Sequence, residues 1–191
     1  MADLDRLAGP STWVALVALV LSAIALGLFF GGAGQFWGPV NDAFIVVAVV
    51  ALIPAVLAVD RIAGDHAAPW TRILTIATVA GIALMATGQT LLIVGRLSLD
   101  GSYVTGGIGV IPFIAWIVLV AVLALVSGVL PRPVGWLAVA TVVAIVAEGV
   151  IAALTQGPAL WVASIVLVVV LVAWLASLAS AFGSAPQLAT V

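Results

Sequence analysis

The sequence contains no cysteine and no lysine, and charged residues make up only 6% of its 191 residues. The lack of cysteine excludes disulfides, thiolate catalysis and Cys-ligated metals or clusters. The lack of lysine excludes Schiff-base chemistry, and all five cations are therefore arginine. The single histidine, His66, excludes bis-histidine haem ligation within one chain. With a net charge of -2 and no basic patch, the sequence indicates no nucleic-acid partner.

Hydrophobic residues, in contrast to charged ones, are abundant in the sequence. They make up 66% of the chain, and the mean hydropathy is +1.46. A water-soluble domain of this size needs a charged surface, which five arginines and seven acids cannot supply. We therefore expect an all-α, polytopic integral membrane protein in contact with the lipid bilayer, with residues 1–191 forming a single membrane domain.

Six apolar runs are each long enough to cross a hydrocarbon layer of about 30 Å. The predicted spans, which form one bundle, cover residues 11–30, 42–62, 71–97, 106–130, 134–155 and 159–182. Asn41 or Asp42 is expected to cap the second helix, and Pro54 to kink it. Residues 98–105 are predicted to form a loop before the fourth span.

The arginines predict how the chain is oriented. If the amino terminus is cytoplasmic, the inner side carries Arg6, Arg61, Arg72 and Arg132, and the outer side carries only Arg96. The excess of positive charge on the inner side predicts a cell-membrane protein with both termini in the cytoplasm.

The third span carries glycines at seven-residue spacing, Gly81, Gly88 and Gly95. Gln89 and Arg96 are also seven residues apart, and they lie roughly 60–80° round the helix from the glycines. A helix that contacts only lipid gains no stability from a side made of glycine and polar residues. We therefore predict that this helix packs at the centre of the bundle.

Glu148 is the one carboxylate placed deep inside a predicted span, about 22 Å along the fifth helix from its inner end. Because a charged residue in a span costs roughly 2.5–3.5 kcal/mol on insertion scales, Glu148 is expected to face the interior and to have partners. Gln89 on the third span lies at a similar depth, Thr141 shares the polar face of Glu148, and Arg96 lies closer to the outer boundary. We predict that Glu148 and Gln89 line one outer cavity, with Arg96 and Thr141 as further ligand-binding residues.

Two interpretations of this cavity remain open. In the first, Glu148 binds a proton, a cation or an amine-bearing solute, and the protein binds or transports a small solute or proton. In the second, the carboxyl is an interhelical lock in a structural or accessory subunit, whose small-residue stripes dock a partner membrane subunit or a second copy of the chain.

An enzyme acting on a lipid or quinone is the class that the sequence supports least. It contains no G-x-S-x-G elbow, no H-E-x-x-H motif, no intramembrane aspartate pair and no serine with a membrane-embedded histidine. Asp60, Asp65 and His66 in one connection could converge on a metal, but their spacing is more typical of a solvated loop. No metal site is predicted, and the sequence assigns no cofactor.

Overall fold

The computed structural model describes residues 2–64, 70–155 and 157–184, and these residues form helices joined by short turns. The helices are α1 (Ala2–Phe30), α2 (Trp37–Ala51), α3 (Ile53–Gly64), α4 (Trp70–Ile93), α5 (Leu99–Leu125), α6 (Arg132–Leu154) and α7 (Pro158–Ser184). Among the described residues, six helices are long and apolar enough to cross a membrane when α2 and α3 are counted together. The predicted class is therefore confirmed: the chain is an all-α, multipass membrane protein.

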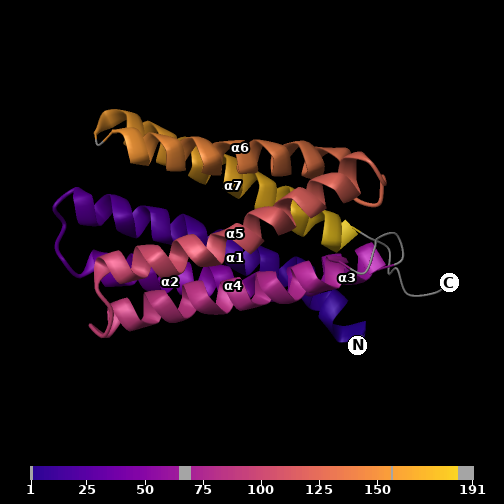
Figure 1. Cartoon of the computed structure of the whole chain (residues 1–191), viewed down its shortest axis with the longest axis horizontal. Helices are drawn as coiled ribbons and strands as arrows, with labels where there is room; N and C mark the ends of the chain where they lie inside the picture. Colours follow the sequence, from indigo (N-terminus) through magenta and orange to yellow (C-terminus); the bar gives the residue numbers. More distant parts are fainter. Residues whose placement is uncertain (1, 65–69, 156, 185–191) are drawn as a thin grey trace.

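The spans form a ring in which each one packs against the spans before and after it, and α7 closes the ring against α1. Figure 1 shows the α6–α7 pair on one side, α1 to α4 on the other, and α5 running diagonally between them. We call the end where α1 begins and α7 ends the terminal end. The opposite end, with the turns after α1, α4 and α6, is the hairpin end. Because α5 lies between α4 and α6, these two helices are not in contact.

The core of the bundle lies toward the terminal end and is built around two tryptophans. Trp116 of α5 and Trp174 of α7 are fully buried, and their rings meet edge to face with centroids 5.7 Å apart. Phe113 stacks on Trp116 at 5.6 Å. Aromatic pairs of this kind contribute about 0.5–1.5 kcal/mol each beyond the area that they bury. This half of the bundle is therefore closed by large side chains that fit one another.

Helices α4 and α5 approach each other through glycine. A Cβ at Gly81 would lie 2.6 Å from the carbonyl oxygen of Gly109, and a Cβ at Gly88 would collide with the side chain of Thr105. Thr78 crosses the same contact by donating a hydrogen bond to the carbonyl of Pro112 at 3.1 Å. Small residues allow such close backbone packing where lipid provides no hydrophobic drive. Gly81 and Gly88 therefore pack α4 against α5. The prediction that this helix lies at the centre of the bundle is wrong, because α4 is one wall of the ring and α5 buries a larger share of its residues.

The third glycine of that series, Gly95, has a different role. Helix α4 ends at Ile93, and Gly95 follows it with φ +69°, a left-handed conformation that suits glycine. Beyond it, the Arg96 N–H donates to the carbonyl of Leu91 at 2.8 Å. The predicted third span, 71–97, therefore extends too far, and Gly95 terminates the helix instead of packing it.

Three other helix starts differ from the sequence prediction. Helix α1 begins at Ala2, nine residues before the predicted start of the first span at residue 11. Helix α2 already begins at Trp37, so Asn41 and Asp42 lie inside it and are not its caps. Helix α5 begins at Leu99, where Ser98 caps it by accepting a hydrogen bond from the Gly101 N–H at 3.2 Å. The predicted loop over residues 98–105 is therefore wrong. The expected effect of Pro54 is confirmed, because α2 ends at Ala51 and α3 resumes at Ile53.

Candidate functional site

One face of α6 changes from buried to exposed along its length. Ala138, toward the terminal end, is fully buried. Gly149 is eleven residues further along, which places it only about 20° round the helix and about 16 Å along its axis. Gly149 is exposed, and a Cβ placed on it would meet nothing within 4 Å. The face that packs against the bundle at one end is therefore accessible at the other.

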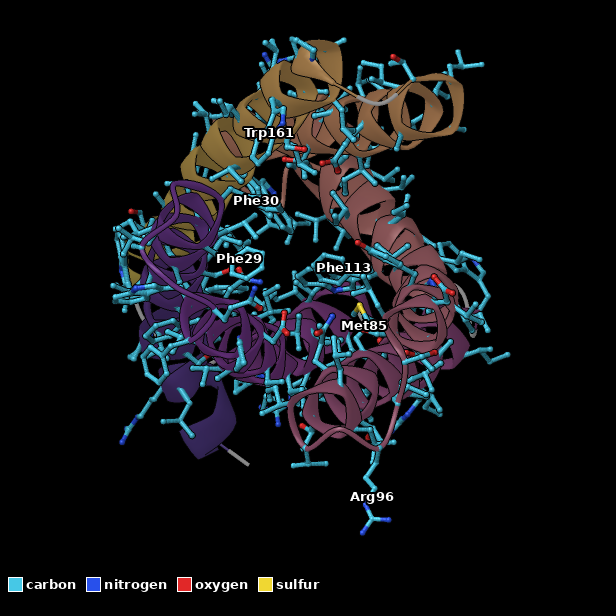
Figure 2. All side chains as sticks on the ribbon, turned by 90° about the vertical axis from the view of Figure 1, so that its left-hand side faces the viewer. Phe29, Phe30, Met85, Arg96, Phe113 and Trp161 are labelled. Atoms are coloured by element: carbon cyan, nitrogen blue, oxygen red, sulfur yellow. The ribbon has the colours of Figure 1, made fainter. Side chains whose placement is uncertain are left out.

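Side chains that point into the ring at the hairpin end are also accessible. Figure 2 views this end and shows Phe29, Phe30, Met85, Phe113 and Trp161 pointing toward the middle of the ring from α1, α4, α5 and α7. Phe30 is 59% exposed and Trp161 is 47% exposed, although their rings touch edge to face at 4.8 Å. The other three are partly exposed. We call the region of the ring toward which these five side chains point the central space.

Glu148 has a partner, but this partner is not on α4. Its Oε1 accepts a hydrogen bond from the Ser164 hydroxyl of α7 at 2.5 Å, a length typical of a hydroxyl bound to a carboxylate. Ser164 lies one turn beyond Trp161, whose ring borders the central space. The expectation that the third span would supply the partner of Glu148 is wrong. Equal depth does not make two helices neighbours, and here α5 separates them.

Gln89 lies on the inward face of α4, one helical turn beyond Met85. Its side chain is partly buried, and its Oε1 is buried without a hydrogen-bond partner among the described residues. Gln89 and Glu148 therefore lie on separate walls of the ring and not in one packed pair.

The other two predicted site residues do not join them. Arg96 is exposed and points away from the bundle in Figure 2, because it follows the end of α4. Thr141 is fully buried, and its hydroxyl donates to the carbonyl of Leu137 in its own helix at 2.8 Å.

The sequence analysis missed a polar link between α1 and α2. The buried Ser22 hydroxyl donates to Asn41 Oδ1 at 2.7 Å, and Asn41 Nδ2 donates to Asp42 Oδ1 at 3.1 Å. Asp42 is therefore a second carboxylate at the hairpin end, partly buried like Glu148. Ser22 belongs to a run of small residues at helical spacing, a pattern typical of a contact between helices. An earlier predicted start of α2 would have placed Asn41 inside the neighbouring helix, where it is a candidate partner for Ser22.

Two surface grooves and the metal candidates do not provide an alternative polar site. One groove lies between α5 and α6 and the other between α1 and α2, and both have only apolar lining. Asp65 and His66 lie outside the described residues. Within the described part of the chain, no group of three or more His, Cys, Asp or Glu side chains is placed to hold a metal ion.

The fold and this site thus define a multipass membrane protein whose hairpin end carries partly exposed aromatic side chains and two partly buried carboxylates. No protein family, curated protein or solved structure is significantly similar to this chain. Its function is therefore argued from the geometry of the central space alone.

Proposed function

We propose that the protein binds a small solute or proton in the central space, as a receptor or as a step in its transport. The observation that carries this proposal is the contrast along α6 between the buried Ala138 and the exposed Gly149. A helix face that borders the ring interior and remains accessible needs an occupant, either water, solute or lipid. The polar groups of Gln89, Glu148 and Ser164 favour water and a polar solute over lipid chains.

In this proposal the central space opens to the outside of the cell membrane. The terminal end carries Arg6, Arg61, Arg72 and Arg132, whereas Arg96 alone lies at the hairpin end. The positive-inside rule then places the terminal end in the cytoplasm and the hairpin end outside. A solute would enter from the outer side and meet the core around Trp116 and Trp174 as a barrier to further movement.

The absence of cysteine allows a direct test, because a single introduced thiol has no background. Gly149→Cys and Ala138→Cys form a matched pair on one face of α6. In intact cells, a charged, membrane-impermeant methanethiosulfonate is expected to modify Gly149→Cys and to leave Ala138→Cys unmodified. If Gly149→Cys reacts only with an apolar, membrane-permeant maleimide, the central space is filled by lipid and the proposal is wrong.

A second function is favoured by the hydrogen bond between Glu148 and Ser164. In that case Glu148 is an interhelical lock that fixes α6 to α7 in a structural or accessory subunit. Glu148→Gln separates the two functions, since glutamine can still accept the Ser164 hydroxyl bond but carries no charge. A structural lock predicts unchanged stability and unchanged association with partners, whereas a solute or proton site predicts loss of binding.

A further inference from the structure

The groove between α5 and α6 lies on the outer surface of the bundle and reaches the last turn of α5, at the terminal end (Figure 1). It has a volume of about 300 Å³ and is lined only by valine, alanine and leucine side chains. Its lining residues Val118 and Val122 lie about 160° round α5 from the fully buried Trp116 and Val120, respectively. The groove therefore faces away from the core, and a lipid acyl chain is the apolar occupant that a bilayer supplies.

Arg132 lies at the terminal end of this groove, on the same face of α6. It precedes the lining residue Val139 by seven residues, which places it within about 20° of Val139 round the helix and about 10 Å closer to the terminal end. Trp136 lies between them on that face, and both Arg132 and Trp136 are exposed. Because tryptophan is enriched at the level of the lipid headgroups, this pair marks the headgroup level at the mouth of the groove.

The charge of Arg132 is not balanced by its own helices. Arg132 is the only charged residue between Asp100 and Glu148, and both of these acids lie at the opposite, hairpin end of α5 and α6. Among the side chains that the structure describes, none pairs with Arg132. Asp60 of α3 accepts a hydrogen bond from the Thr75 hydroxyl at 3.0 Å. A partner anion for Arg132 is therefore available from the bilayer, as the phosphate of a lipid headgroup.

We propose that this groove binds one anionic phospholipid, whose acyl chain lies between α5 and α6 and whose phosphate accepts hydrogen bonds from Arg132. The planar guanidinium of arginine matches the geometry of a phosphate group. A zwitterionic phospholipid has the same chains and phosphate but no net charge, so the attraction of Arg132 for the lipid charge distinguishes the two. This lipid site lies outside the ring and does not depend on what the central space binds.

The test measures which lipid lies at the far end of the groove. Val146 is one turn beyond Val142 on the groove face of α6 and is 54% exposed, so a bimane on Val146→Cys lies beside the acyl chain. The labelled protein is placed in phosphatidylcholine nanodiscs that contain the same small fraction of either phosphatidylglycerol or phosphatidylcholine with brominated chains, which quench bimane. We expect the brominated phosphatidylglycerol to quench as if it were enriched about fivefold, the effect of one basic residue near anionic lipid.

Matched variants assign this preference to the groove and to Arg132. A bimane on Val166→Cys, which is 49% exposed on α7 and lines neither groove, is expected to be quenched equally by the two lipids. With the label on Val146→Cys, Arg132→Gln is expected to remove the preference. Arg72→Gln removes an exposed arginine at the same end from α4, which lines neither groove, and is expected to keep it. Val122→Phe fills the groove without changing any charge and is expected to reduce it.

Other results overturn the inference in distinguishable ways. Equal quenching by the two lipids at Val146→Cys would mean that bulk lipid covers the groove without selection. A preference that survives in Arg132→Gln, or that Arg72→Gln removes to the same extent, would assign it to the overall charge of this end. An equal preference at Val166→Cys would exclude a site specific to the groove. Little quenching by either lipid at Val146→Cys would show that a second copy of the chain covers the groove.

Discussion

The two ends of the bundle are built from the same apolar residue types but are packed very differently. Toward the terminal end, α7 buries Trp174, Leu175, Leu178 and Ala179 within six residues. Toward the hairpin end, none of the described residues from 142 to 173 of the α6–α7 pair is buried. Because lipid is as apolar as valine or leucine, hydrophobicity alone does not press these helices together. The fully buried residues gather where the Trp116 and Trp174 rings meet and where glycines bring α4 and α5 together, whereas the α6–α7 pair toward the hairpin end is only partly buried or exposed.

The largest expected effect is the loss of an interlocking ring. Trp174→Ala is expected to lower the free energy of unfolding by about 3–5 kcal/mol, because it leaves a large void beside Trp116. Trp161→Ala removes a ring that is 47% exposed and is expected to cost about 0.5–1.5 kcal/mol, the value of its contact with Phe30. The measurement is unfolding by sodium dodecyl sulfate in mixed micelles. Equal losses for the two variants would show that the ends are equally packed.

A single added methyl group is expected to lower the free energy of unfolding at Gly81 and to raise it at Gly149. Gly81→Ala places a Cβ against the Gly109 carbonyl, and overpacking of this kind costs about 1–3 kcal/mol. Gly149→Ala places the same group where nothing lies within 4 Å, so the only change is the better helix propensity of alanine, worth about 0.5–1 kcal/mol. The same unfolding titration measures both. A destabilised Gly149→Ala would indicate that another chain or helix already packs against this face.

Much of the fold could be predicted because its determinants are local. Span number follows from hydropathy over about 20 residues, and the packing role of Gly81 and Gly88 follows from their small size and helical spacing. The starts of α2 and α5 were misplaced because Asn41, Asp42 and the segment after Ser98 have the residue types of caps and loops. Helix α2 is already helical before Asn41, and α5 begins at the local cap Ser98, which the loop prediction overlooked.

The candidate site could be predicted only in part. Residue counting gives the depth of Glu148 and Gln89 along their helices, and both lie near the hairpin end. It does not reveal which helix lies beside α6, since that depends on how the six spans are ordered around the ring. Ser164 was therefore missed as the partner of Glu148, although serine at this depth on the next span was a visible candidate.

The smallest predicted effect concerns the hydrogen bond that joins α6 to α7 at the end where the described residues of this pair are only partly buried or exposed. Ser164→Ala removes the donor to Glu148 and is expected to cost about 0.6 kcal/mol and at most about 1.7 kcal/mol, the range found for interhelical hydrogen bonds in membranes. The test is a double-mutant cycle in which Ser164→Ala is combined with Glu148→Ala, and a shared bond requires the second substitution to cost less once the first is present.

Additive losses in this cycle would mean that the bond contributes nothing to holding the pair together. A positive coupling within that range would show that this hydrogen bond holds the Glu148 carboxyl against α7. The hairpin end would then be ordered by polar contacts that leave its interior accessible, whereas the terminal end is ordered by packing that fills it. This combination, an anchored carboxylate in an accessible interior, is what a solute site at the hairpin end requires.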